Sequence, residues 1–349
     1  VLQSVQEAVD KHGLRFPLDV GARGSCTIGG SIATNAGGIN VLRYGMMRSL
    51  VLGLEAVMAD GTVVSSMNRM LKNNAGYDVK QLFIGTEGTL GVVTRAVLRL
   101  FPKPASRQSA LVALNDFEDV TAFLTLLRRR LADSLSAFEI MWGDYYAAVT
   151  GENGHRAPLV RAYAFYVVFE SEGSNPAADA DRFEGVLDEA LTQELIADAV
   201  IPKSESEARA IWNIREDFDA ILEPEPVYLY DVSLPIRHMA AYVDKVKVNV
   251  RERWPEGQCY TLGHVADGNL HFFVAPYEDG ELHEASDECV YGPLADLGGS
   301  VSAEHGIGLE KLRWLPYSRS PTEIELMRSL KRSLDPRNIL NPGRVVANN

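Results

Sequence analysis

Two histidines on either side of a tight-turn dipeptide are the residues whose types and spacing most clearly suggest chemistry. His264 and His271 flank Asp267-Gly268, a pair typical of two-residue β-hairpin loops because both turn positions take positive φ. Folding the chain there predicts that His264 stands directly opposite His271, with Cβ atoms about 4.5–5.5 Å apart. Two imidazoles at that distance can bind one metal ion. Glu304 and His305 follow later and would complete a metal site with an open position for a substrate oxygen.

These histidines also have an ordinary interpretation. A histidine in a strand is usually a structural residue with a hydrogen-bond partner, and short motifs match by chance. From the residues alone, a metal or catalytic site and a set of unconnected structural histidines both remain open.

The bulk properties restrict the class of protein. The chain has 349 residues, enough for two or three domains, and a formal net charge of −13, which argues against nucleic-acid binding. No apolar run approaches the ~20 residues that span a bilayer, so we expect no transmembrane segment. Three scattered cysteines without a CxxC pair indicate a reducing compartment. The chain opens at Val1 in a predicted helix over 1–12, and we expect an N-terminal portion, with any targeting sequence, to precede it.

The elements that must position the histidines follow from hydrophobic periodicity. Residues 1–104 are rich in glycine and short β-type runs, with strands predicted at 49–59, 62–66 and 90–100, and Pro102-Lys103-Pro104 marks a domain boundary. Beyond it, strands alternate with amphipathic helices, which predicts an α+β domain with a largely antiparallel sheet and helices on one face. The predicted strands are 110–114, 160–170 and 227–234, and the predicted helices are 117–131, 177–191, 205–222, 236–250, 283–297 and, in the C-terminal segment, 322–334.

Two glycine-rich segments are further candidates for ligand binding. They are Ile28–Gly38 and Ile84–Gly91, and their glycines would let backbone N–H groups approach a phosphate or ring oxygen. Neither contains GxGxxG or GxxxxGK[ST], so a Rossmann site and a P-loop are unsupported. Tight turns and close backbone packing explain the same glycines equally well.

Five segments in one order resemble a known family. Together they resemble the FAD-linked 2-hydroxyacid dehydrogenases of the vanillyl-alcohol-oxidase type, which include D-lactate and D-2-hydroxyglutarate dehydrogenases. The segments are Ile28–Gly38, Gly85–Val93, Gly263–His271, Ser302–Gly306 and Asp335–Gly343. Leu18–Gly21, Trp212–Glu216 and Tyr230–Pro235 are most similar to the D-2-hydroxyglutarate branch.

The resemblance implies a flavin held between two FAD-binding subdomains beneath a substrate-capping domain. Residues 1–104 would then be a partial FAD-binding domain, 105–300 the capping domain with the metal hairpin, and 301–349 a helical segment that returns to complete the active site. The residues implied to bind FAD are Gly29, Gly30, Ala33, Thr34, Asn35, Gly37, Gly38, Glu87, Gly88, Gly91, Val92 and Asn341.

The resemblance also implies a reaction. His264, His271 and Glu304 would bind a divalent metal, zinc or manganese, and His305 would be the base beside the flavin. Arg215 would bind the substrate carboxylate, although from the residues alone a surface ion pair with its acidic neighbours is the ordinary interpretation. The implied reaction oxidises a small D-2-hydroxy acid to the 2-oxo acid and passes a hydride to the flavin. The electrons would then go to an electron-transfer flavoprotein, a quinone or a cytochrome.

Three departures from the family pattern shape the expected activity. The family's early pyrophosphate loop would lie upstream, so we expect this chain by itself to bind FAD weakly or not at all and to be inactive alone. A lysine of the hydroxyglutarate branch falls on Leu229, and an asparagine falls on Phe273. These two apolar residues predict a preference for D-lactate or a longer apolar D-2-hydroxy acid over D-2-hydroxyglutarate.

Other functions remain alternatives. A D-2-hydroxyglutarate dehydrogenase is the first, and an alkylglycerone-phosphate synthase-like transferase is the second, although no Arg/Lys cluster lies near the motifs. A flavin-less subunit of an oxidoreductase complex is the third, and the retained histidines argue against it. A homodimer is compatible with the family, and the expected location is the cytoplasm in a bacterium or the mitochondrion in a eukaryote.

Overall fold

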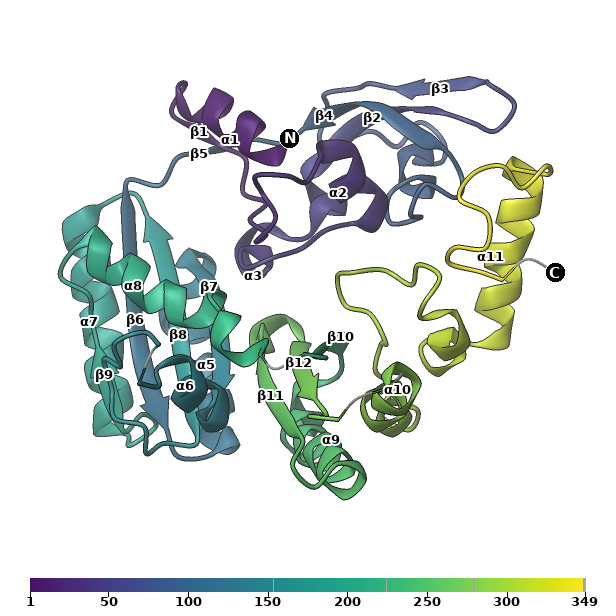
Figure 1. The fold of residues 1–349 in the computed structure, drawn as a ribbon. Helices are drawn as coiled ribbons and strands as arrows, with labels where there is room; N and C mark the ends of the chain where they lie inside the picture. Colours follow the sequence, from purple (N-terminus) through teal and green to yellow (C-terminus); the bar gives the residue numbers. More distant parts are fainter. Residues whose placement is uncertain (153, 224, 279, 281, 348–349) are drawn as a thin grey trace. The chain divides into compact units, whose positions relative to one another are not determined.

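The computed structural model describes residues 1–152, 154–223, 225–278, 280 and 282–347. The chain forms two compact units (Figure 1). One unit comprises Val1–Lys103 together with Val301–Asn349, and the other comprises Pro104–Ser300. Among the described residues, no helix combines the length and the apolar character that crossing a membrane requires.

The second unit is built on a seven-stranded antiparallel sheet. Its strand order is β10-β12-β11-β7-β8-β6-β9. The strands are β6 (Ser106–Leu114), β7 (Leu135–Trp142), β8 (Phe165–Gly173), β9 (Asp198–Val200), β10 (Tyr228–Ser233), β11 (Gln258–Gly263) and β12 (Asn269–Ala275). The four strands from β10 to β7 carry the candidate site.

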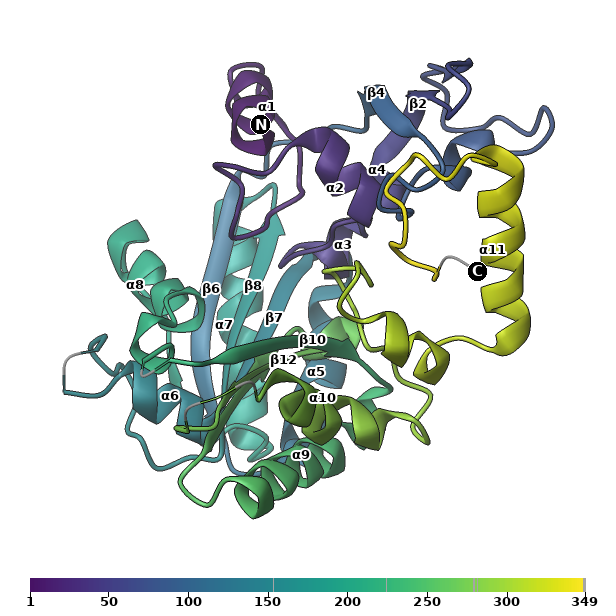
Figure 2. The ribbon, with the colours of Figure 1, turned by 45° about the vertical axis from the view of Figure 1, so that its right-hand side comes forward.

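Helices cover both faces of this sheet. On one face, α5 (Phe117–Leu131) and α7 (Pro176–Thr192) bring Phe123 and Phe183 against Phe169 of β8. On the same face, α9 (Met239–Arg253) packs Tyr242 against Phe272 of β12. The Tyr242 hydroxyl donates to the carbonyl of Val290 in α10 (His283–Tyr291) at 2.7 Å, and Figure 2 shows the two helices side by side. The predicted α+β class and antiparallel sheet are confirmed, but α6 (Gly143–Val149) and α8 (Glu205–Glu216) lie on the second face, where helices were not expected.

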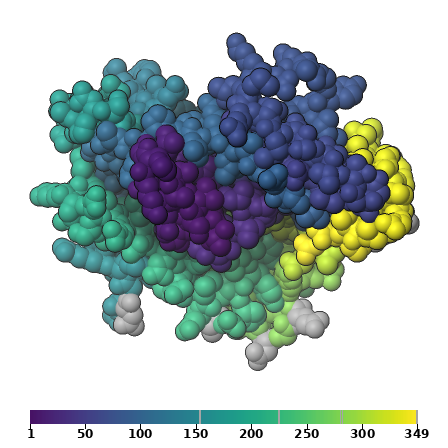
Figure 3. Space-filling view, turned by 90° about the horizontal axis from the view of Figure 1, so that it is seen from above, coloured from purple at the N-terminus to yellow at the C-terminus, as the bar shows by residue number. Residues whose placement is uncertain are grey.

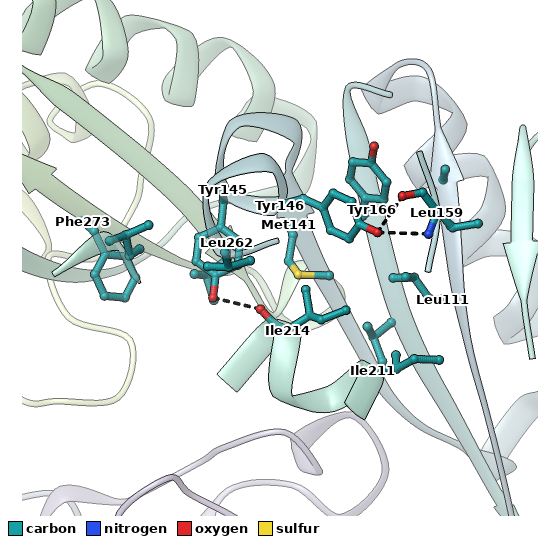
Figure 4. Close-up of a cluster of buried hydrophobic side chains, with 14 residues drawn as sticks. Leu111, Met141, Tyr145, Tyr146, Leu159, Tyr166, Ile211, Ile214, Leu262 and Phe273 are labelled. Carbon is teal, nitrogen blue, oxygen red and sulfur yellow. Dashed lines mark hydrogen bonds between the residues drawn. The ribbon is translucent and has the colours of Figure 1, made fainter. Parts of the chain in front are cut away.

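The core beneath α6 and α8 fixes the end of α8 (Figure 4). Tyr145 and Tyr146 of α6 are buried with Ile211 and Ile214 of α8. The Tyr145 hydroxyl donates to the backbone carbonyls of Ile214 and Arg215 at 3.3 and 3.2 Å. Because these carbonyls end the helix, the core holds the backbone from which the Arg215 side chain extends.

The first unit has a three-stranded sheet of order β3-β2-β4 and a short β1-β5 pair. Its C-terminal helix binds the N-terminal portion through Lys331, whose ammonium donates to the carbonyl of Thr89 at 3.0 Å. Figure 3 shows the yellow C-terminal segment against the blue residues of the same unit. Its elements are α1 (Leu2–Asp10), β1 (Leu14–Arg15), α2 (Ile28–Thr34), α3 (Val41–Tyr44), α4 (Met47–Leu50), β2 (Val51–Val57), β3 (Val63–Ser66), β4 (Val92–Leu98), β5 (Phe101–Pro102) and α11 (Pro321–Leu334).

Several elements differ from the predicted ones. The strand predicted at 160–170 begins only at Phe165, and the helix predicted at 205–222 ends at Glu216, before a short 3-10 turn at Asp219–Ile221. β7 and α6 were not predicted. All eight residues of β7 are buried, so its sequence lacks the regular apolar-polar alternation that marks a half-exposed strand.

Candidate active site

The histidine hairpin has a different register from the predicted one. β11 and β12 are antiparallel, but Leu262 is the residue paired with His271, so the prediction that His264 stands opposite His271 is wrong. Val265–Asp267 form a 3-10 turn, and within the Asp267-Gly268 pair only Gly268 has positive φ, at 94°. The loop is therefore longer than a two-residue turn, and His264 is its first residue.

The two imidazoles nevertheless come together. The ring centroids of His264 and His271 are 5.3 Å apart, and the ring planes are nearly perpendicular. Each ring offers a nitrogen, and these nitrogens lie within 4.8 Å of each other. Two nitrogens that share one zinc ion each lie at ~2.0–2.1 Å from it, so the pair has a separation that suits a common ion.

A buried carboxylate that the sequence analysis missed joins His264 to Arg215. Glu139 of β7 accepts from Nδ1 of His264 at 2.6 Å with one oxygen and from Nε of Arg215 at 2.8 Å with the other. Nη2 of Arg215 lies 3.4 Å from Nε2 of His264. All three residues are at least 93% buried. Arg215 is therefore part of a buried triad, and the surface ion pair is excluded for it.

The charges of the triad stabilise the ionised form of its carboxylate. Burial opposes ionisation of Glu139, but His264 and Arg215 together hold the pKa of its carboxyl below the ordinary value. A lone glutamate inside an otherwise apolar stretch was the one signal in the sequence that pointed to this residue.

His271 has its own acidic neighbour. Asp231 is fully buried on β10 and is the direct cross-strand partner of His271, with Oδ1 4.0 Å from Nδ1. The same Oδ1 accepts from the side-chain amide of Asn269 at 2.8 Å. Each histidine of the pair therefore has a carboxylate on the neighbouring strand, but only the one beside His264 is within hydrogen-bond distance.

Within the first unit, Glu304 binds a glycine-rich turn. Its Oε1 accepts from the backbone N–H of Gly38. A Cβ added at Gly37 would lie 2.7 Å from the same oxygen, so a side chain there would displace the carboxylate. Gly38 has φ of +86°, and a Cβ on it would lie 1.8 Å from the carbonyl oxygen of Asp19. Both glycines thus allow a close approach that no other residue permits.

Glu87 anchors the backbone that follows His305. Its carboxylate accepts from the N–H groups of Ile307 at 2.7 Å and Gly308 at 2.9 Å. Its own N–H donates to the carbonyl of Ala33 at 2.8 Å, and its carbonyl accepts from the side-chain amide of Asn341. Glu87 thus connects its own segment with those that contain Ala33 and Asn341 and with the backbone that follows His305.

The glycine-rich segment Ile28–Gly38 is partly helical. Residues Ile28–Thr34 form α2, whose first turn is capped by the hydroxyl of Thr27 accepting from Gly30 at 3.0 Å. Tight turns therefore explain only the end of the segment, because its first seven residues are helical. Asn35 ends the helix in the left-handed conformation, and its side chain accepts from the N–H of Arg48.

The remaining candidate residues lie in the same unit. His305 is exposed, Gly91 is packed against the ring of Phe83, and Gly88 approaches the amide of Asn341. The structure thus brings His264, His271 and Arg215 together in one unit. In the other unit it joins Glu87 to Asn341 and Glu304 to Gly38. Gly29, Gly30, Thr34 and Val92 lie on α2 or at the start of β4.

Family models cover most of the chain. Residues 103–345 match the FAD linked oxidases, C-terminal domain, and residues 1–66 match the FAD binding domain. The chain belongs to the FAD-linked oxidases. Because the first match covers both the histidine hairpin and the Glu304-His305 pair, the family assignment includes the residues of the candidate site.

Named relatives agree with this family. The chain is 40% identical over 348 residues to the mitochondrial D-2-hydroxyglutarate dehydrogenase of Bos taurus, covering 99% of this chain and 63% of that protein. It is 33% identical to the D-2-hydroxyglutarate dehydrogenase of Stutzerimonas stutzeri, covering 99% of this chain and 75% of that protein. The chain thus spans less than two thirds of the bovine protein.

Solved structures support the fold of this FAD-linked oxidase. An alkyldihydroxyacetonephosphate synthase matches with a TM-score of 0.72 and 17% identity over 99% of this chain and 63% of its own. A p-cresol methylhydroxylase matches with the same TM-score and identity over 99% of this chain and 74% of its own. These likenesses concern the fold alone.

Proposed function

We propose that this chain carries out the substrate-binding and proton-transfer part of a FAD-dependent oxidation of a D-2-hydroxy acid to the 2-oxo acid. The observation that carries the proposal is the triad of Arg215, Glu139 and His264 beside His271. A 2-hydroxy acid has its carboxylate and its hydroxyl on adjacent carbons. A guanidinium beside a pair of imidazoles suits both groups at once, because the guanidinium binds carboxylates and the imidazoles bind metals.

The donor set fits a divalent metal. His264 and His271 would be two ligands and Glu304 the third, which leaves a position for the substrate oxygen. The covalent chain supports the third ligand. Ser300 exchanges backbone hydrogen bonds with Ser233 of β10, whose cross-strand partner is Asn269 of β12. Glu304 follows only four residues later in the sequence, so the covalent chain allows it to serve as the third ligand.

The first unit fits a flavin through its glycine-rich segments. Gly85 and Glu87 donate to the carbonyls of Ile32 and Ala33, so the two segments lie side by side with little side-chain bulk. Gly29 to Gly38, Gly85 to Val92 and Asn341 would hold FAD. The match to an FAD binding domain over residues 1–66 supports this part of the proposal.

The residues of the chain then have distinct tasks. When bound, the flavin supplies the acceptor for two electrons and the metal supplies a Lewis acid toward the hydroxyl oxygen. Arg215 binds the substrate carboxylate through the N–H groups that Glu139 does not occupy. His305 accepts the hydroxyl proton at a ring nitrogen, because a neutral imidazole carries a lone pair that can act as a general base.

The substrate tail would meet Leu229. Leu229 is the cross-strand partner of Phe273 and lies on the same sheet face as Asp231 and His271. Phe273 is 4% exposed and packs against Phe218, so it belongs to the core, whereas Leu229 is 50% exposed. Leu229 is therefore the residue to test for specificity. Leu229 offers no cation to a distal carboxylate, which favours D-lactate or a longer apolar D-2-hydroxy acid.

D-2-hydroxyglutarate is the second candidate substrate, because the bovine and bacterial relatives carry its name. A dye-reduction assay of the full-length protein with D-lactate, D-malate and D-2-hydroxyglutarate distinguishes the two. We expect kcat/KM to favour D-lactate, and L229K to move the ratio toward D-2-hydroxyglutarate by at least tenfold, about 1.4 kcal/mol of transition-state binding. A wild-type ratio that favours D-2-hydroxyglutarate tenfold would refute the predicted preference. Turnover of none of the three would refute the proposed function.

A further inference from the structure

Glu139 lies between Arg215, which would bind the substrate carboxylate, and His264, which would bind the metal ion. Its two oxygens are divided between an imidazole and a guanidinium, at 2.6 and 2.8 Å. Its side chain is 1% exposed, and it lies on β7, a strand without any residue of the histidine or glycine motifs. Water therefore has no access to replace either hydrogen bond, and the carboxylate bridges its two partners directly.

The bond to His264 determines which nitrogen of that ring can bind a metal. A carboxylate accepts hydrogen bonds, so Nδ1 of His264 carries a hydrogen, and in the neutral ring that a metal requires the lone pair is on Nε2. Nε2 is also the nitrogen that lies 3.4 Å from Nη2 of Arg215. Glu139 thus directs the metal-binding nitrogen of His264 toward the side of the ring where the guanidinium lies.

The charges give Glu139 a second effect. A divalent ion on Nε2 would lie close to the guanidinium of Arg215, and two cations at short range in a buried site repel strongly. The carboxylate of Glu139 contacts both the guanidinium and the imidazole that holds the ion. Its negative charge would lower that repulsion. Its position would keep Arg215 close to the bound ion without occupying all five N–H donors of the guanidinium.

We propose that Glu139 is a positioning residue that couples metal binding at His264 to carboxylate binding at Arg215. The inference rests on the proposed function, because it assumes the metal and the hydroxy acid. Glu139 touches neither substrate nor cofactor and acts through its two partners. Its loss should therefore weaken zinc binding and raise the KM for the hydroxy acid together, although the two ligands bind different residues.

The test measures zinc affinity and kinetics of the full-length protein. Zinc alone is titrated in competition with a chromophoric chelator, so this readout needs no turnover. We expect E139Q to bind zinc 10- to 100-fold more weakly than wild type, the range typical of partners that orient a metal ligand. We also expect a several-fold higher KM for D-lactate and a shift of the His264 ring signals in ¹⁵N NMR toward a mixture of tautomers.

Glu170 offers a matched control. It is a buried glutamate on β8 that contacts Ser136 and Arg107. E170Q therefore carries the general cost of neutralising a buried carboxylate in this sheet, and its zinc affinity should stay within twofold of wild type. Should E139Q fail to fold, E139D is used instead. Its shorter side chain keeps the charge but cannot bridge both partners, so weakened zinc binding is again expected.

The outcomes separate the two proposals. If H264A abolishes zinc binding while E139Q and E139D bind zinc like wild type, the role of Glu139 is refuted and the metal site stands. If wild type binds no zinc, or H264A binds it unchanged, the metal site fails, and the role of Glu139 fails with it. Equal losses in E139Q and E170Q would mean that only sheet stability is affected, and this also overturns the inference.

Discussion

The two units hold their parts of the candidate site in different ways. In the unit with the seven-stranded sheet, charged side chains hold one another, as Glu139 does with His264 and Arg215. In the other unit, Glu87 and Glu304 hold backbone N–H groups of distant segments. The first arrangement depends on the charges of three residues, whereas the second depends on glycines that let a carboxylate approach the backbone.

This difference determines how mutations should act. A substitution in the charged triad removes a specific partner and should alter ligand affinity at little cost to the fold elsewhere. A substitution at a glycine beside a carboxylate moves the backbone itself and should alter stability first. Each variant below can contradict that division.

The largest effect on activity is expected at the histidine pair. H264A should lower the turnover of the full-length protein by more than about 10³-fold, because the metal ligand and its orientation are both lost. The melting temperature should change little compared with that loss. H283A is the control, since His283 is 54% exposed at the start of α10 and should leave turnover unchanged. A melting temperature lowered by more than 10 °C in H264A would mean that the residue is structural.

The largest effect on stability is expected at Gly38. G38A should cost about 2–4 kcal/mol, because a Cβ would collide with the backbone oxygen of Asp19 and φ is positive. Gly61 is the matched control, with φ of +88° and no atom within 4 Å of an added Cβ, so G61A should cost only about 1 kcal/mol. Urea unfolding measures both. Equal losses of unfolding free energy in G38A and G61A would show that an added Cβ at Gly38 does not collide with the backbone of Asp19.

A smaller, catalytic effect is expected at Glu87. E87Q replaces one accepting oxygen by an amide that faces the N–H of Gly308, which should loosen the backbone that follows His305. We expect kcat to fall by about 10- to 100-fold, with zinc affinity within twofold of wild type. E310Q, at an exposed glutamate nearby in sequence, should leave both unchanged. Weaker zinc binding in E87Q would contradict the expectation that only the unit with the seven-stranded sheet determines zinc affinity.

The smallest effect is expected at Asp335, which shapes the turn that carries Asn341. Its carboxylate accepts from the N–H groups of Ile339 and Leu340 at 3.1 and 2.8 Å and pairs with Lys331. Burial opposes ionisation, but these partners hold the pKa of Asp335 below its ordinary value. D335N should therefore cost about 1–2 kcal/mol at pH 7.

The pH dependence of that cost has a definite sign. A carboxyl whose pKa is lower in the folded state contributes stability above its unfolded pKa, near 4, and loses it as the pH falls toward the folded value. The difference in unfolding free energy between wild type and D335N should thus be constant from pH 7 to 5 and should shrink below pH 4. A difference that grows in acid would contradict this assignment.

The sequence predicted the elements with strong periodicity and missed those without it. The helix predicted at 117–131 is α5, because its apolar residues recur with helical spacing. β7 was missed because all its residues are buried. The hairpin register was wrong because a 3-10 turn replaced the expected two-residue turn.

The site was predictable where its residues form short motifs. His264 and His271 lie seven residues apart, and the glycine-rich segments are continuous in sequence. Glu139 lies 125 residues from His264 and 76 from Arg215, and only the order of strands in the sheet brings the three together. No local pattern encodes that order, so Glu139 and its bonds to His264 and Arg215 were found only in the structure.

We propose that the histidine pair binds a metal ion together with Glu304, and X-ray absorption at the zinc edge of the zinc-loaded full-length protein measures the ligands of that ion. We expect two imidazole nitrogens at ~2.0–2.1 Å with oxygen donors completing the shell, the loss of one imidazole in H264A, and a weakened oxygen shell in E304Q. A sulfur shell at ~2.3 Å, or a spectrum that H264A leaves unchanged, would contradict it.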